Sequence, residues 1–156
     1  MRRFICCCCA AVLVGCAKSE QRAAGDTTTS ALASGTASTL ISLPDVAGKW
    51  VMRTMAASGD SVLVTYEMVA GTDASGWTFN FPKRAPIAIR IVTVAGDSIV
   101  TEAGPYESVL RKGVQVTTHS VMRLLDGKLV GATVARYATS GPDSVLHLRT
   151  EGTRAP

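Results

Sequence analysis

The stretch VTTHSVMRLLDGKLVGATVARY, residues 116–137, carries the strongest local structural signal of the chain. It contains two runs of apolar and β-branched residues on either side of Asp126-Gly127. An Asp-Gly pair favours a two-residue type I′ turn, because both central residues of that turn need a positive φ. The stretch therefore predicts a β-hairpin in which Leu124 faces Leu129 and the pairing continues outward from there.

This register sorts the side chains of the hairpin into two faces, because successive side chains of a strand point to opposite sides of a sheet. One face carries no charge and holds Val116, Thr118, Ser120, Met122, Leu124, Leu129, Gly131, Thr133, Ala135 and Tyr137. The other face mixes charge with small apolar residues: His119, Val121, Arg123, Lys128, Val130, Ala132, Val134 and Arg136. The uncharged face is predicted to be the interior.

The next strand extends the same division. A four-residue loop at residues 140–143 would pair Tyr137 with Leu146 and Ala135 with Leu148. His147 and Arg149 then fall on the charged face. Every charge of three strands thus lies on one side, which is typical of a sheet that is buried on its other side.

Alternating apolar and polar residues, separated by Gly, Asp, Asn and Pro, continue through the rest of the chain. They predict strands at 48–56, 61–70, 76–81, 86–94, 98–110 (broken near Gly104-Pro105), 114–125, 128–139 and 144–151. Eight antiparallel strands in up-and-down order close into a barrel whose interior holds side chains or one small ligand. The predicted fold class is all-β, an eight-stranded antiparallel up-and-down β-barrel.

The alternation also assigns inward positions to the earlier strands. These are Trp50, Met52, Val62, Val64, Tyr66, Met68, Ile87, Ile89 and Ile91, while Trp77, Phe79 and Phe81 share one face. Aromatic residues therefore line one side of the interior, and small polar residues line the other. Two interiors remain open: a partly hollow barrel, or a core that the aromatic side fills.

The N-terminus has the pattern of a targeting signal. Arg2 and Arg3 precede an unbroken apolar run over residues 4–14. This run is too short to span a membrane, which takes about 20 apolar residues, but it has the length of a signal peptide core. It ends in Leu13-Val14-Gly15-Cys16, which closely resembles the lipobox of bacterial lipoproteins.

That resemblance implies that residues 1–15 are a signal peptide and that Cys16 is lipidated after cleavage. Ala17 follows the cysteine, which in the enterobacterial sorting rule implies a location at the outer membrane, facing the periplasm. The alternative is an ordinary secretory signal with a chance cysteine. The consecutive cysteines Cys6 to Cys9 lie within the apolar run, where cysteine acts as a small hydrophobic residue.

Residues 16–43 are predicted to be the lipidated cysteine and a flexible linker. Ala, Ser, Thr and Gly dominate this stretch, and no aromatic residue is present to build a core. A short helix over residues 30–38 is the alternative. The barrel domain is predicted at 44–156, and residues 40–43 are its first candidates for contact.

Composition excludes several classes of function. The chain has 16 Lys+Arg and 12 Asp+Glu, and two of the positive charges are Arg2 and Arg3. The rest of the chain therefore has little excess positive charge, which excludes a concentrated basic stripe for binding nucleic acid. A hydrophobic content of 47% excludes global disorder. All 5 cysteines lie within the first 16 residues, so the domain has neither a disulfide framework nor a cysteine-based zinc site.

The first predicted strand opens with Gly48-Lys49-Trp50. This triplet resembles the Gly-x-Trp signature of lipocalins and related calycin barrels. In that family the tryptophan closes one barrel end beneath a late arginine, for which Arg149 and Arg154 are the candidates. The alternation places Arg149 outside, which counts against it. The alternative is a core tryptophan on the first strand of a β-sandwich.

No catalytic set is apparent. Gly59-Asp60-Ser61-Val62 and Gly96-Asp97-Ser98-Ile99 are similar to the Gly-Asp-Ser-Leu block of one esterase class. Each copy sits where a turn enters a strand, a place where Asp and Ser are common for structural reasons. The only histidines, His119 and His147, fall on the outer face, whereas nucleophilic catalysis and haem binding would require an inward or convergent histidine. We therefore expect neither an enzyme, nor a metal site, nor a cofactor.

The favoured hypothesis is a lipid-anchored envelope protein whose barrel binds a small apolar or amphipathic molecule. The predicted ligand-binding residues are Trp50, Tyr66, Trp77, Phe79, Thr118, Ser120, Thr133 and Tyr137. The alternative is a structural or assembly lipoprotein with a filled barrel that acts through its outer surface. The expected partners are the membrane, through the lipid anchor, and the small ligand.

Overall fold

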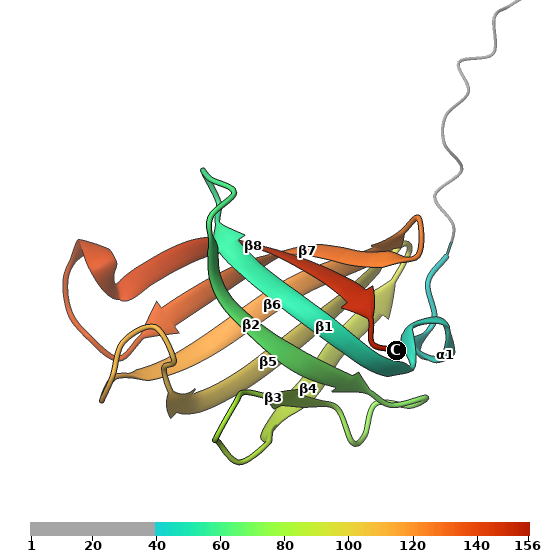
Figure 1. Cartoon of the computed structure of the whole chain (residues 1–156), viewed down its shortest axis with the longest axis horizontal. Helices are drawn as coiled ribbons and strands as arrows, with labels where there is room; N and C mark the ends of the chain where they lie inside the picture. Colours follow the sequence, from blue (N-terminus) through green and yellow to red (C-terminus); the bar gives the residue numbers. More distant parts are fainter. Residues whose placement is uncertain (1–39) are drawn as a thin grey trace, which may run out of the picture. The chain divides into compact units, whose positions relative to one another are not determined.

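The computed structural model describes residues 40–156, which form a closed barrel of eight antiparallel strands in sequence order (Figure 1). The strands are β1 (Gly48–Ala56), β2 (Val62–Ala70), β3 (Thr78–Asn80), β4 (Ile87–Ala95), β5 (Ser98–Glu107), β6 (Gln115–Leu125), β7 (Lys128–Tyr137) and β8 (Val145–Arg154). A short helix, α1 (Leu43–Val46), precedes β1, and the 3-10 turn η1 (Pro142–Ser144) precedes β8. The predicted all-β up-and-down barrel is confirmed.

The β6–β7 hairpin has the predicted register. Leu124 pairs with Leu129, and Ser120 pairs with Thr133. The turn residue Asp126 has φ 49°, and Gly127 has φ 74°, as the type I′ turn requires. The local turn signal therefore set the pairing of these two strands.

The predicted β7–β8 register is wrong by two residues. Leu146 pairs with Ala135 rather than Tyr137, and Leu148 pairs with Thr133 rather than Ala135. The connection is longer than expected, because η1 occupies residues 142–144 and the pairing begins only at Val145. A shift of two residues preserves the side-chain faces. His147 is therefore exposed and Leu148 buried, as predicted.

Most predicted inward positions are buried, but Val62 is not. Val62 is 38% exposed, and it pairs with Met55 beside a register shift between Thr54 and Met55. This irregularity gives β1 two consecutive buried residues, Thr54 and Met55, so the simple alternation fails at that end of the strand. A β-bulge has this effect because one strand gains a residue relative to its partner.

The half of the barrel near α1 is filled by large side chains. The residues that are less than 2% exposed there are Val46, Trp50, Met52, Met68, Trp77, Ile99 and Leu129. A Cβ on Gly152 would collide with the sulfur of Met52, so glycine allows this methionine to lie against β8. The aromatic and methionine side chains thus close this half of the interior.

The helix α1 and the end of β8 lie at this filled end of the barrel, while the β5–β6 and β7–β8 connections lie at the other end (Figure 1). The carboxylate of Asp45 accepts hydrogen bonds from the backbone and side chain of Ser42, which also lower the pKa of Asp45. Ile41 packs into the core and donates its backbone N–H to Gly96. The predictions for residues 1–39, including the signal peptide, Cys16 and most of the linker, lie outside the described residues.

Candidate functional site: a cavity in one half of the barrel

A cavity of about 50 Å³ lies inside the barrel, in the half away from α1. Side chains from both sheet and loops line it, and it is partly open to solvent. The lining residues are Thr54, Val64, Tyr66, Phe79, Phe81, Tyr106, Ser108, Val109, Leu110, Val116, Thr118, Ser120, Thr133, Ala135, Tyr137, Leu148 and Thr150. No charged side chain belongs to this set. Eight of its members are aliphatic residues or phenylalanines, and the others, including the tyrosines, carry hydroxyl groups. The interior is therefore apolar with hydroxyl groups distributed over it.

Several hydroxyl groups of the lining form hydrogen bonds with other groups of the protein. The hydroxyls of Ser120 and Thr133 are 2.8 Å apart, and Thr118 Oγ1 donates to the carbonyl oxygen of Ala103 at 3.5 Å. Thr54 forms a side-chain hydrogen bond with Tyr66. These groups are satisfied without a ligand.

Thr150 differs from these neighbours. Thr150 is 3% exposed, and its buried Oγ1 has no hydrogen-bond partner within residues 40–156. A buried hydroxyl without a partner is uncommon and costs free energy. Among the described residues, Thr150 is therefore the cavity-lining residue whose buried hydroxyl is left without a partner.

The aromatic wall of the cavity comes from β2, β3 and the residue that follows β3. The rings of Tyr66 and Phe79 meet edge to face with centroids 5.1 Å apart, and Tyr66 lies 4.8 Å from Phe81. Burial raises the pKa of Tyr66 to about 12, and the hydrogen bond from Thr54 opposes this shift only in part. Burial also raises the pKa of Tyr106. Both tyrosines are therefore neutral at physiological pH.

The mouth segment, residues 108–114, covers the cavity between β5 and β6. Val109 and Leu110 line the cavity from this segment. Ser108 Oγ accepts the backbone N–H groups of Leu110 at 3.0 Å and of Arg111 at 3.1 Å. These local bonds give the segment a compact turn that places two aliphatic side chains over the lumen.

Two arginines hold the mouth segment from opposite sides. The guanidinium of Arg84 donates to the backbone oxygens of Glu107 and Ser108 and lies 3.9 Å from the Glu107 carboxylate. The guanidinium of Arg111 lies 4.1 Å from the ring centre of Tyr137 and donates to the backbone oxygen of Asp143 at 2.6 Å. The mouth segment is thus tied to the β3–β4 connection and to η1 by contacts at the surface.

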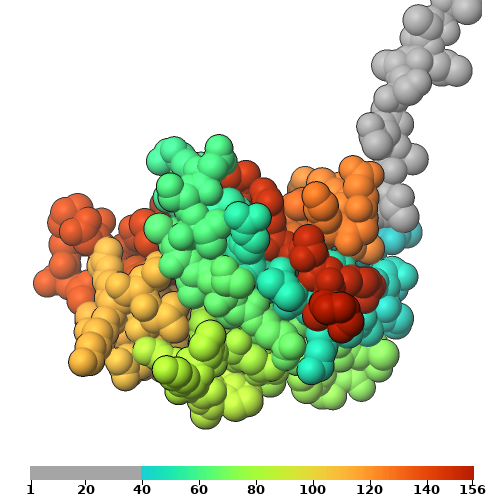
Figure 2. Space-filling view, viewed as in Figure 1, coloured from blue at the N-terminus to red at the C-terminus, as the bar shows by residue number. Residues whose placement is uncertain are grey.

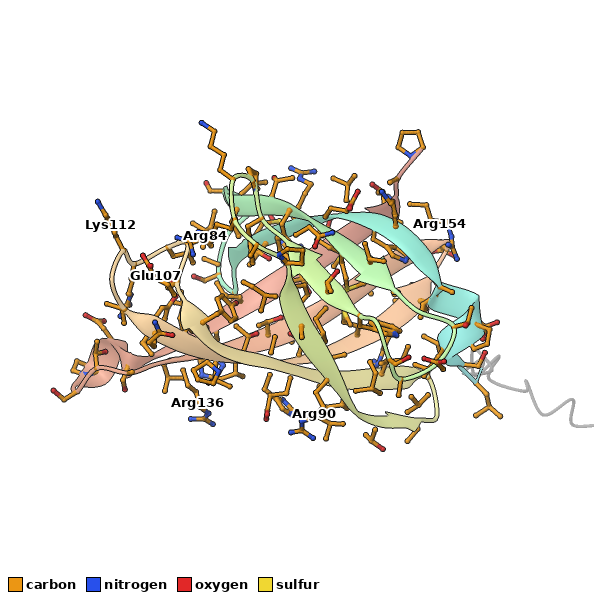
Figure 3. All side chains as sticks on the ribbon, turned by 90° about the horizontal axis from the view of Figure 1, so that it is seen from below. Arg84, Arg90, Glu107, Lys112, Arg136 and Arg154 are labelled. Atoms are coloured by element: carbon orange, nitrogen blue, oxygen red, sulfur yellow. The ribbon has the colours of Figure 1, made fainter. Side chains whose placement is uncertain are left out.

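The figures show the same arrangement. In Figure 2 the β5–β6 and β7–β8 connections, in yellow-orange and red-orange, lie next to each other at one end of the barrel. In Figure 3 Arg84, Glu107 and Lys112 lie toward that end, and Arg154 lies at the opposite one. The cavity and the late arginine therefore belong to opposite ends.

The structure brings six of the eight residues predicted to bind a ligand around one cavity. They are Tyr66, Phe79, Thr118, Ser120, Thr133 and Tyr137. Trp50 and Trp77 instead belong to the filled half, where their indole N–H groups donate to Val46 and Asp73 at 2.8 Å.

Sequence reasoning missed Thr54, Tyr106, Thr150 and the mouth segment as lining residues. Thr54 and Thr150 lie two residues beyond Met52 and Leu148, so the alternation already placed both inside. No sequence signal indicated that the loop containing Val109 and Leu110 folds over the lumen.

The arginine above Trp50 is Arg154. Its guanidinium lies 4.5 Å from the ring centre and donates to the carbonyl oxygens of Ala47 at 2.8 Å and Asp45 at 2.7 Å. Arg149 points outward, as the alternation indicated, and pairs with Asp60 at 2.6 Å. The Gly-x-Trp triplet therefore lies beneath an arginine from the last strand.

Neither histidine approaches the cavity. His119 and His147 are both exposed, on the outer faces of β6 and β8. Within residues 40–156 no three His, Cys, Asp or Glu side chains gather in a group that could hold a metal ion. The residues that line the cavity can therefore offer a ligand hydrogen bonds and apolar contacts.

No protein-family model, curated protein or solved structure significantly matches this chain. In the part of the chain that the structure describes, no helix has the length and apolar character needed to cross a membrane. The cavity is the feature from which a function can be argued.

Proposed function

We propose that this protein is a lipid-anchored protein of the bacterial cell envelope whose barrel binds one small amphipathic molecule. The observation that carries this proposal is the uncharged cavity, which has an aromatic wall and several hydroxyl groups. Small-molecule sites in proteins are usually concave and mostly apolar, with a few polar groups that orient the ligand. The cavity has this composition, whereas the other half of the same barrel is filled.

The size of the cavity defines how a ligand enters. A volume of about 50 Å³ holds only a few water molecules. A ligand of more than a few non-hydrogen atoms requires Val109 and Leu110 to move outward. Besides the packing of Val109 on the core, the contacts that hold their segment are hydrogen bonds and one ion pair, which are weak beside the paired strands of the barrel. The mouth segment is therefore the proposed entrance.

The proposed membrane attachment rests on the N-terminal sequence. Three acyl chains on Cys16 would exceed the two signals that suffice for stable anchoring. The linker would then leave the barrel free to meet ligands at the membrane surface. An amphipathic ligand suits this location, because such molecules gather at the boundary between lipid and water.

Methyl NMR of the barrel tests the ligand-binding proposal. Residues 40–156 form a closed barrel with its own hydrophobic core, so they can be produced as a self-contained folding unit. Titration with 1-hexanol should shift the methyl signals of Val64, Val116 and Leu148 saturably. The signals of Met52 and Ile99, in the filled half, serve as the internal control and should stay unchanged.

Uniform shifts of the methyl signals without saturation would reject the proposal.

Intrinsic tryptophan fluorescence is a poor reporter of binding here, since Trp50 and Trp77 do not line the cavity. Tyrosine signals or methyl groups are the better choice.

A second candidate function is a structural or assembly role through the outer surface. Val92, Val94 and Val121 are each more than a third exposed on strands β4 and β6. Val121 lies between Val100 and Ala132 in the register, so apolar residues continue across three strands. Val121→Lys should abolish binding of an envelope protein partner if this role is correct, while leaving the hexanol titration unchanged.

A further inference from the structure

We infer that the buried part of the ligand is uncharged and carries one hydrogen-bonding group, a hydroxyl or a carbonyl, that pairs with Oγ1 of Thr150. This inference rests on the proposed ligand-binding function and names the chemistry that the cavity selects. It makes Thr150 a specificity-determining residue.

The position of Thr150 explains why the protein itself offers no partner. In the barrel register Thr150 lies between Thr54 on β1 and Gly131 on β7. Thr54 already forms a hydrogen bond with Tyr66. Gly131 has no side chain, and a Cβ there would collide with the backbone oxygen of Val121. Thr54 thus already has Tyr66 as a partner, and Gly131 has no side chain to offer.

The other small hydroxyl groups of the lining are engaged. Ser120 and Thr133 pair with each other, and Thr118 donates to the Ala103 carbonyl and bonds with Tyr106. A ligand group that bonded to one of these would add a hydrogen bond to a hydroxyl that already has a partner. A group that bonds to Thr150 Oγ1 instead satisfies a hydroxyl that is otherwise buried without a partner, which makes it the favoured anchor.

The absence of charge in the lining sets the second property of the ligand. An ion buried without a counter-charge is strongly disfavoured. The cationic groups at the mouth, Arg84 and Arg111, are engaged with Glu107, Asp143 and the Tyr137 ring. A carboxylate or ammonium group is therefore rejected from the position beside Thr150, whereas a hydroxyl or carbonyl is accepted.

Affinity measurements on residues 40–156 with three probes of equal chain length test this inference. The probes are 1-hexanol, hexanoate and hexane, and the variants are Thr150→Val, Thr150→Ser and Thr101→Val. Thr150→Val removes only the hydroxyl group at nearly constant shape. Thr150→Ser keeps the hydroxyl. Thr101→Val makes the same change at a buried threonine that does not line the cavity.

We expect Thr150→Val to weaken 1-hexanol binding about three- to tenfold, as loss of one neutral hydrogen bond does. Hexane binding should not weaken, and the Ser and Thr101→Val variants should keep hexanol affinity within about twofold of the original. Hexanoate should bind at least about tenfold more weakly than hexanol.

The outcomes separate the inference from the function on which it rests. Hexanol binding that is indifferent to Thr150→Val would show that only water occupies this position, and it would overturn the inference while leaving ligand binding intact. Hexanoate binding as tight as hexanol would place the polar group at the basic mouth and would also overturn it. Failure of all three probes to bind would reject the proposed function and the inference together.

Discussion

The guanidinium of Arg154 lies 4.5 Å from the ring centre of Trp50 and joins the last strand to the first at the filled end of the barrel. The same guanidinium holds the carbonyl oxygens of Asp45 and Ala47, so one side chain ties α1, β1 and β8 together. This end is closed by packing and by the arginine, whereas the cavity end is covered only by loops.

Replacing Arg154 should destabilise this closed end. Arg154→Ala removes a cation–π contact and two hydrogen bonds from a charged donor, which should lower the free energy of unfolding by about 1–2 kcal/mol. Urea unfolding of residues 40–156 measures it. The control, Arg136→Ala on the exposed outer face, should change stability by less than about 0.5 kcal/mol. Equal effects of the two variants would contradict a special role for Arg154.

Tyr137 should be important for the second hydrophobic cluster. It is 6% exposed and packs with Val116, Ala135 and Leu148. Tyr137→Ala should therefore lower the free energy of unfolding by about 3 kcal/mol or more, as a large-to-small change in a core does. Tyr137→Phe keeps the ring and should cost much less. A Tyr137→Ala variant as stable as the original would show that the ring is not a core element.

Alkaline pH should reveal the burial of Tyr66. Its pKa is raised to about 12 in the folded protein, while the unfolded chain titrates near the ordinary value of 10. The unfolded state therefore loses its proton first, and the stabilisation that is present below pH 10 is lost as the pH rises toward 12. Ultraviolet titration of phenolate should show one of the three tyrosines ionising last. Tyr66→Phe should remove that step and flatten the decline in stability; an unchanged decline would refute the assignment.

The mouth segment should open more often when Arg84 is removed. Arg84→Ala deletes the contacts with Glu107, so the backbone amides of Leu110 and Arg111 should exchange with deuterium severalfold faster. Arg90→Ala, which breaks the Arg90–Glu102 pair on the outer barrel face, is the matched control and should leave those amides unchanged. Identical exchange in all three proteins would mean that Arg84 does not hold the segment.

Membrane attachment should depend on Cys16. Cys16→Ala removes the proposed site of acylation, so the full chain should stay unprocessed or be released from membranes into the soluble fraction. Cys9→Ala makes the same substitution within the apolar run and should leave attachment intact. A processed Cys16→Ala protein that still sediments with membranes would exclude lipidation as the anchor.

Much of the fold was predictable because its signals are local. Asp126-Gly127 specifies a turn through the φ values of two residues, and that turn pairs β6 with β7 over ten positions. Alternation over each strand then separated inward from outward residues, including His147 and Leu148. The β7–β8 register was not predictable in the same way, since the connection contains a 3-10 turn instead of the expected four-residue loop.

Local patterns in the chain establish that strands alternate, that charges lie outside and that eight strands suffice for a closed barrel. Which half of the barrel is filled depends on how distant residues meet in the folded protein. Trp50 and Trp77 lie with the methionines at the α1 end, so the same inward aromatic residues that favoured a ligand site instead close the core there. The unpartnered hydroxyl of Thr150 also depends on closure, because its neighbours on β1 and β7 come together only when the last strand meets the first. Side-chain direction follows from neighbouring residues, whereas volume and hydrogen-bond partners follow from residues that are distant in sequence.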